Sequence, residues 1–262
     1  MTPTCADILA AIGSCAPLHL QESWDNSGLQ VGDVQQPCTG VLLALDPTEA
    51  VVAEAIERGC NLVITHHPLL FRGLKRIAGD SCVERTVIAA IRAGVVIYSS
   101  HTALDSAVGG VSAEMARRLG ATVVAPLQPS APEAATGLGV VAELAEPCDA
   151  AAFAQLVHTA FGTMPIRSSR ADVGTFTRIA LCGGAGGEFI PKAIAAGAAA
   201  YVTADVRYHD FVDHGADIFI LDIGHFESES CAKDIFYRAI TEKFANFAVY
   251  YSQLETNPIN YL

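Results

Sequence analysis

The sequence predicts an α/β protein of two α/β units with mainly parallel sheets, and two observations support this class. Short runs of β-branched and apolar residues alternate with longer amphipathic runs along the 262 residues. Such alternation is typical of βαβ units, in which parallel strands are joined by helices. His and carboxylate residues follow three of the strand-like runs. Because the carboxyl ends of parallel strands meet at one crevice, a ligand site is expected there.

The elements follow from residue patterns taken in order along the chain. Runs of strand length and composition predict eight strands: Val41–Asp46, Asn61–Thr65, Val95–Ser100, Gly137–Leu144, Arg178–Cys182, Ala200–Thr203, Asp217–Ile223 and Asn246–Ser252. Helical periodicity predicts seven helices: Pro3–Cys15, Thr48–Arg58, Ser81–Ala93, Val111–Leu119, Ala150–Phe161, Phe189–Ala196 and His225–Phe244.

A proline-rich stretch, Ala125–Thr136, is the predicted linker between the two units. The first unit is expected to comprise residues 1–125 and 220–262, and the second residues 126–219. The first unit is discontinuous because His225 and Glu229, near the C-terminus, are expected to join ligands that come early in the chain.

Composition limits the classes of function. Hydrophobic residues make up 51% and charged residues 17%, so the chain can bury a large core. The net charge of −12 makes nucleic acid and anionic membranes unlikely partners, although Arg72, Lys75 and Arg76 form a local basic patch. No apolar run approaches the ~20 residues of a membrane-spanning helix, and no signal-peptide pattern opens the sequence. The eight cysteines form no Cys-x-x-Cys pair, so we expect a cytoplasmic protein with buried thiols.

Six residues of metal-binding type, in three pairs, follow strand-like runs. They are His66 and His67 after Asn61–Thr65, His101 and Asp105 after Val95–Ser100, and His225 and Glu229 after Asp217–Ile223. Imidazole suits zinc or iron, and carboxylates suit harder ions and can bridge two of them. Three pairs are more than one ion needs, which predicts a two-metal site of the kind commonly used for hydrolysis.

The local spacing is compatible with this site. Adjacent side chains on a strand point to opposite faces, so His66 and His67 can share a site only where the strand ends, and Pro68 favours an end there. His225 and Glu229 are four residues apart and would share one face of a helix that begins near Gly224. Each pair alone is common by chance; their occurrence at three strand ends favours the metal site.

Three further features leave alternatives open. The segment Cys182–Gly187 can cradle a phosphate, but it lacks the Lys-Ser/Thr of a P-loop, and a tight turn with close packing is favoured. Asp205 and His209 are either a polar helix surface or a support for the metal ligands. Trp24 lies in a polar loop that lines the crevice or simply forms a turn with a buried indole.

Five segments resemble successive motifs of the Nif3-like dinuclear-metal proteins, many of which are called GTP cyclohydrolase 1 type 2 homologues. The segments are ESWDNSGLQVG from Glu22, ITHHPLLFRGLK from Ile64, HTALD from His101, ADVRYHD from Ala204 and DIGHFESE from Asp222. The ending TNPINYL from Thr256 resembles one branch of that family. Ala204 departs from the glycine that relatives often have before the aspartate.

The resemblance implies a two-domain α/β fold, a dinuclear metal centre and a hexameric assembly. Carried over by motif, the ligands of two divalent ions (zinc, iron or manganese) would be His66, His67, Asp105, His225 and Glu229, with Glu229 as the bridge. His101 is then the candidate general acid or base, or a support for a ligand. A metal-dependent hydrolase of nucleotides or other phosphate-bearing small molecules is the leading hypothesis. The alternative is a non-catalytic metal-handling or scaffold protein.

Overall fold

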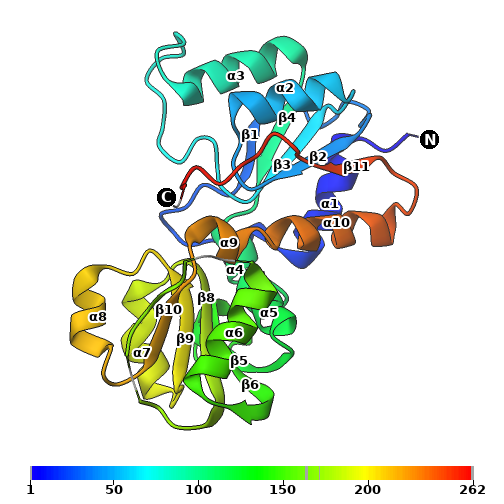
Figure 1. Ribbon diagram of the computed structural model, residues 1–262. Coiled ribbons are helices and arrows are strands. Elements are labelled where there is room, and N and C mark those ends of the chain that lie inside the picture. The colour runs from blue at the N-terminus through cyan, green and yellow to red at the C-terminus, as the bar shows by residue number, and fades with distance from the viewer. Residues whose placement is uncertain (1, 163–164, 171, 261–262) are drawn as a thin grey trace. The chain divides into compact units, whose positions relative to one another are not determined.

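The computed structural model describes residues 2–162, 165–170 and 172–260, and it confirms the α/β class. The chain forms two compact units (Figure 1). Unit 1 runs to Leu104 and resumes over Ala232–Pro258, and unit 2 is built on Asp105–Cys231. The boundaries therefore fall at 104/105 and 231/232, whereas the sequence suggested 125/126 and 219/220.

Unit 1 contains a five-stranded sheet in the order β1-β4-β3-β2-β11. Four of its strands are parallel, and β1 is antiparallel to β4 at the edge. The strands are β1 (Gly28–Val31), β2 (Val41–Ala44), β3 (Leu62–Thr65), β4 (Val96–Ser99) and β11 (Val249–Tyr251). Every residue of β2, β3 and β4 is buried, as expected of strands with both faces covered.

Helices cover both faces of the unit 1 sheet (Figure 1). α2 (Glu49–Glu57) and α3 (Cys82–Ala93) pack their apolar faces on Leu42, Val63 and Ile97. α1 (Cys5–Cys15) and α10 (Ala232–Lys243) pack against each other, and α10 contacts β2 and β11. A short 3-10 helix, η1 (Leu18–Leu20), follows α1.

Unit 2 contains a six-stranded sheet in the order β5-β6-β8-β9-β10-β7. The central strands β8, β9 and β10 are parallel, and β5, β6 and β7 pair with their neighbours in antiparallel fashion. The strands are β5 (Ala121–Pro129), β6 (Gly137–Cys148), β7 (Arg167–Ser168), β8 (Phe176–Ala185), β9 (Ala200–Ala204) and β10 (Phe219–Asp222).

The unit 2 helices also lie on both faces of their sheet (Figure 1). The helices are α4 (Thr102–Asp105), where the chain leaves unit 1, α5 (Val111–Arg118), α6 (Ala150–Phe161), η2 (Gly187–Phe189), α7 (Ile190–Ala195), α8 (Tyr208–His214) and α9 (His225–Glu229). Phe189, Ile190 and Ala193 of η2 and α7 pack with Tyr201 and Ile220 in one core. On α6, Phe153 meets Phe176 of β8 with 5.4 Å between ring centroids.

Two sequence expectations are wrong in detail. Most of the predicted linker Ala125–Thr136 belongs to β5 and the turn after it, because an edge strand tolerates Pro126 and Pro129. The predicted helix His225–Phe244 is broken between α9 and α10. At the break, Ser228 and Ser230 hydroxyls donate to carbonyls one turn back, and such bonds bend helices.

The C-terminal segment of unit 1 is fastened by a buried carboxylate on α2. Glu54 is 3% exposed and accepts hydrogen bonds from the Ser252 hydroxyl and from the Gln253 and Leu254 amides. Burial alone would raise the pKa of Glu54, but these bonds and the Arg58 guanidinium hold it below its usual range. Among the described residues, no helix combines the length and apolar character needed to cross a bilayer.

We expect Glu54→Gln to lower the free energy of unfolding by about 1–3 kcal/mol near neutral pH, because it removes a charged acceptor from four donors. A depressed pKa stabilises the fold above the unfolded-state value of about 4.3, and this stabilisation is lost as pH falls through the folded-state pKa. Urea unfolding should therefore show that the free energies of unfolding of the wild type and of Glu54→Gln become equal as the pH falls from 7 to 3. Glu57→Gln, exposed on the same helix, is the control; equal stability of all three proteins at pH 7 would contradict the assignment.

Candidate metal centre

Three histidines converge at the carboxyl ends of β3 and β4 in unit 1. His66 and His67 directly follow β3, and His101 follows β4. One ring nitrogen from each lies within 4.8 Å of the others. His66 is fully buried, and the side chains of His67 and His101 are 21% and 18% exposed. The end of β3 thus lets two adjacent residues reach one place, as the sequence predicted.

Each of these rings is held through its Nδ1 atom. His66 Nδ1 lies 2.9 Å from the Ser100 carbonyl oxygen, His67 Nδ1 lies 2.8 Å from Asp46 Oδ1, and His101 Nδ1 lies 2.8 Å from Asp25 Oδ1. A carbonyl or carboxylate oxygen only accepts, so Nδ1 carries the proton in every case. In the neutral ring the lone pair is then on Nε2. Metal-binding histidines in proteins usually have this arrangement, with the second nitrogen donating to an oxygen.

Asp25 organises the surroundings of His101. Its side chain is fully buried, and besides His101 it accepts from the Thr102 amide, the Thr102 hydroxyl and the Ser27 hydroxyl. Burial alone would raise the pKa of Asp25, but the hydrogen bonds from His101, Thr102 and Ser27 hold it far below its usual range. The carboxylate is therefore ionised at any working pH and fixes both the ring and the tautomer of His101.

Asp46, the partner of His67, is held in place by the C-terminal segment. Glu255 Oε1 accepts from the backbone amides of Leu45 and Asp46 at the end of β2, and its other oxygen pairs with Lys233 on α10. The Glu255 carboxylate is 4% exposed. A residue near the end of the chain thus supports the turn that orients His67.

In unit 2, α9 carries His225 and Glu229 on one face, as their spacing predicted. His225 Nε2 lies 2.9 Å from Glu229 Oε2, and its Nδ1 lies 2.7 Å from Asp205 Oδ2. Burial alone would lower the pKa of His225, but the two carboxylates raise it to about 10. Two carboxylates thus contact one imidazole, and a divalent ion fits this donor set.

Asp205 has an unusual backbone conformation that aims it at His225. It follows β9 with a φ of +53°, in the left-handed region that non-glycine residues rarely adopt. Such strain is typical of functional positions, where the surrounding structure maintains it. His209, its expected partner four residues on, is exposed and packs on the Tyr208 ring instead. Of the two alternatives that the sequence left open, Asp205 therefore fits support of a candidate ligand, and His209 fits an exposed helix surface.

Asp105 and Glu229 act on the same buried thiol in unit 2. Burial raises the pKa of Cys182 strongly, and the negative charges of Asp105 and then Glu229 raise it further. In the metal-free protein, burial and these charges therefore favour the neutral thiol form of Cys182. Asp105 ends α4, four residues after His101. Both predicted carboxylate ligands of unit 2 therefore lie close to the end of β8, where Cys182 sits.

The glycine segment after Cys182 makes room for the side chains of α9. It continues β8 to Ala185, and the Gly184 amide donates to the Ser228 hydroxyl at 2.9 Å. Gly184 has a φ of +63°, and a Cβ there would overlap the Glu229 carboxylate and come within 3.3 Å of His225. The tight-packing alternative from the sequence is therefore the one that the structure supports.

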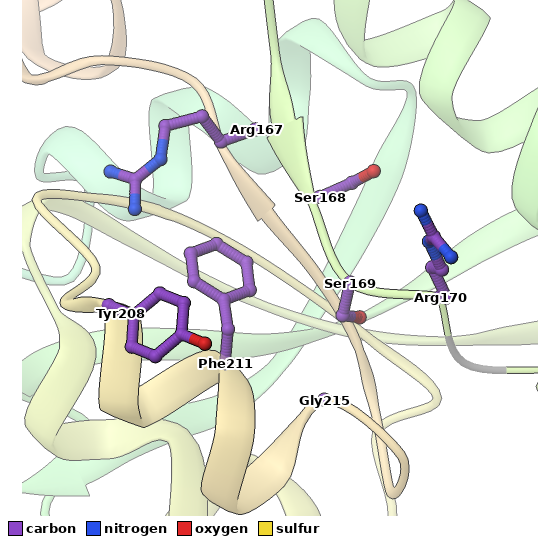
Figure 2. A pocket seen from close by; sticks show the side chains of 7 residues that line it. All are labelled: Arg167, Ser168, Ser169, Arg170, Tyr208, Phe211 and Gly215. Carbon is purple, nitrogen blue, oxygen red and sulfur yellow. The ribbon is translucent and has the colours of Figure 1, made fainter.

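Unit 2 has a second feature that the sequence did not indicate. A concavity of about 560 Å³ lies between β7 and α8, with the rings of Tyr208 and Phe211 on one side and Arg170 on the other (Figure 2). Arg167, at its edge, is paired with Asp222 at 2.9 Å and stacks over Phe211. Among the described residues that line it there is no histidine, cysteine or carboxylate, so the concavity does not resemble a metal site.

Oxygen-anchored histidines and carboxylates in an α/β fold could hold a metal ion. Comparison with known proteins identifies the family. The family model for Duf34/NIF3 (NGG1p interacting factor 3) matches residues 3–258. The chain is 37% identical to the GTP cyclohydrolase 1 type 2 homolog of Clostridium perfringens, covering 85% of this chain and 86% of that protein. It is 34% identical to the homolog of Lactococcus lactis subsp. lactis, covering 97% of each. The chain belongs to the Duf34/NIF3 family.

Solved structures agree with this assignment. A hypothetical protein of Staphylococcus aureus superimposes with a TM-score of 0.89 at 26% identity, over 99% of both chains. A Bacillus cereus protein related to NIF3 superimposes with a TM-score of 0.87 over the full length of both chains, and at 24% identity it supports the fold alone.

We expect Gly184→Ala to reduce bound divalent metal by at least about tenfold in affinity, because the new methyl group displaces Glu229 and crowds His225. Gly120→Ala is the matched control: its φ of +67° imposes the same backbone strain, but a Cβ there meets nothing within 4 Å. Elemental analysis after dialysis against limiting zinc measures the loss, and circular dichroism checks the fold. Equal metal content in the two variants would contradict the role given to Gly184.

Proposed function

We propose that this protein is a hydrolase that uses two divalent metal ions and acts on a nucleotide or another phosphate-bearing small molecule. We propose His66 and His67 as ligands in unit 1, and Asp105, His225 and Glu229 as ligands in unit 2. Family membership supports metal binding, and the local geometry of each unit supports the choice of ligands.

One observation carries the proposal. His66, His67 and His225 each donate a hydrogen bond from Nδ1 to an oxygen, at 2.9, 2.8 and 2.7 Å. Three different acceptors, the Ser100 carbonyl and the Asp46 and Asp205 carboxylates, each hold the proton on Nδ1. Histidines that only fill a core have no need of a common tautomer, whereas histidines that present Nε2 to a metal do.

The metal ions would supply Lewis acidity to the scissile bond and to the attacking water. The chain's own residues supply the proton chemistry. His101 is proposed as the general acid or base, because Asp25 fixes its Nδ1 proton and leaves Nε2 to accept a second one. The buried Asp25 carboxylate then stabilises the imidazolium that forms.

The substrate class rests on two supports. Relatives at 37% and 34% identity carry the name GTP cyclohydrolase 1 type 2 homolog, which points to nucleotides. Arg72 and Lys75 are exposed in the loop after His67 and could hold a phosphate.

A non-catalytic metal-handling role is the second candidate, and one observation favours it. Three imidazoles converge in unit 1, so His101 could serve as a further metal ligand. It would then not act as the proposed general acid or base.

We expect His101→Ala to lower turnover about 100-fold while the protein keeps both ions, as for loss of a general acid or base. Turnover of GTP and of a generic phosphoester, and metal content, would be measured on one preparation. His19→Ala, an exposed histidine on η1, is the control and should change neither quantity. If His101→Ala loses metal, His101 is a ligand or supports one, and this result favours the metal-handling role. If the variant retains full activity, the acid–base assignment is wrong.

We further propose that the protein is a homo-oligomer, most simply the hexamer that the family resemblance implies. Val108, Val123 and Val124 are 64%, 40% and 52% exposed, and the last two lie on β5, the edge strand of the unit 2 sheet. Exposed apolar residues on a long edge strand are typically covered by another chain. Light scattering should give about six times the chain mass of 27.5 kDa, and a Val124→Lys variant should dissociate. A monomer at micromolar concentration would contradict the proposal.

A further inference from the structure

Two exposed aromatic rings stand beside the histidines of unit 1. The ring centroid of Trp24 lies 6.1 Å from that of Phe71 and 6.1 Å from that of His101, and the Phe71 and His101 centroids are 6.3 Å apart. All three contacts are edge-to-face. His101 in turn lies 5.3 Å from His66 and 5.6 Å from His67. The aromatic cluster is thus continuous with the candidate metal ligands.

Both apolar rings are open to solvent to an unusual degree. Trp24, the single tryptophan of the chain, is 57% exposed, and Phe71 is 48% exposed. Aromatic rings bury a large apolar area when they pack, so a protein usually covers them. The alternative of a buried indole, which the sequence left open, is therefore excluded for Trp24.

The two rings are held by a network that links their backbones. Asn26 Nδ2 donates to the Leu70 carbonyl at 2.8 Å, the Leu70 amide donates to Gln30 Oε1 at 3.0 Å, and Gln30 Nε2 donates to the Asn26 carbonyl at 2.7 Å. Asp25, between Trp24 and Asn26, is bonded to His101 and Thr102. The two backbone segments that carry the rings are therefore tied together before any ligand binds, which lowers the entropic cost of binding.

We propose that Trp24 and Phe71 form the binding wall for a planar heteroaromatic ring of the ligand, such as a purine. Offset stacking and edge-to-face contact are the preferred geometries for such a ring. A ligand seated there would lie against His101, and its phosphate would meet the charges of Arg72 and Lys75 in the same loop as Phe71. The inference deepens the proposed hydrolase function by naming the feature of the substrate that is recognised, and the binding itself can be tested without turnover.

A small planar ligand fits this site better than a second protein. The wall consists of two rings, and both lie edge-to-face against the candidate acid–base residue His101. The segment that follows Phe71 carries Arg72, Lys75 and Arg76 on a chain whose net charge is −12, so it favours an anionic ligand over another copy of the chain.

The fluorescence of Trp24 tests the proposal directly, because no other tryptophan contributes to the signal. The metal-loaded protein is titrated with GMP, and with ribose 5-phosphate as a ligand that has the phosphate but no aromatic ring. We expect saturable quenching by GMP and at least about tenfold weaker binding of ribose 5-phosphate, since stacking of one base contributes substantially to affinity. Calorimetry on the same samples gives the dissociation constants independently of the indole.

Phe71→Ala should raise the dissociation constant of GMP about tenfold and leave that of ribose 5-phosphate unchanged. Phe71→Tyr should restore binding, and Tyr208→Ala, which removes an exposed aromatic ring of unit 2, should have no effect. Elemental analysis should show unchanged metal content in all three variants. Light scattering should show unchanged mass, because a fall in mass on Phe71→Ala would make the wall a contact between copies and overturn the proposal.

Two other results would overturn it: no saturable quenching at millimolar GMP, or equal affinity for GMP and ribose 5-phosphate. If GMP binds as expected but neither GTP nor phosphoesters are turned over, the wall stands and the hydrolase proposal fails. If turnover is seen but Phe71→Ala leaves it and GMP affinity unchanged, the hydrolase stands and the wall fails.

Discussion

The anchoring of imidazole Nδ1 atoms by oxygen acceptors is the interaction on which the candidate site depends. An imidazole that rotates or exchanges tautomers presents either nitrogen, and a metal site needs the same one each time. Here a backbone carbonyl and three carboxylates fix His66, His67, His101 and His225. Those acceptors are themselves held, Asp25 by Thr102 and Ser27, and Asp46 by the backbone bonds to Glu255. The precision of the site thus comes from residues that do not bind metal.

The fold brings these side chains together without disturbing the sheets, because neighbouring parallel strands end at the same edge. In unit 1, buried β3 and β4 deliver their histidines to one edge of the sheet. In unit 2, the glycines at the end of β8 and the left-handed backbone of Asp205 after β9 surround His225 and Glu229. The Gly184 and Asp205 backbones depart from ordinary strand geometry only near the ends of β8 and β9, so the interior of the sheet remains regular.

The sequence predicted the α/β class and the placement of the ligand-type residues, because strand runs, strand ends and the four-residue spacing of His225 and Glu229 are local signals. It did not predict the anchors Asp46 and Asp25, since each lies more than 20 residues from the histidine that it holds. The stretch Ala125–Thr136 was predicted to be a linker because prolines are frequent in loops, although an edge strand also tolerates them. The four-residue strand β1 was missed because it is short and its pairing shifts between Leu29 and Val31.

The central claim is that Nε2 atoms, with carboxylates, bind two divalent ions. Anomalous scattering from crystals of the protein loaded with zinc tests it most directly. The account predicts two anomalous peaks per chain, with Nε2 of His66 and Nε2 of His67 each about 2.0–2.1 Å from one of them and Nδ1 of both rings still bonded to Ser100 and Asp46. A single peak, coordination through Nδ1, or zinc bound only elsewhere on the surface would contradict it.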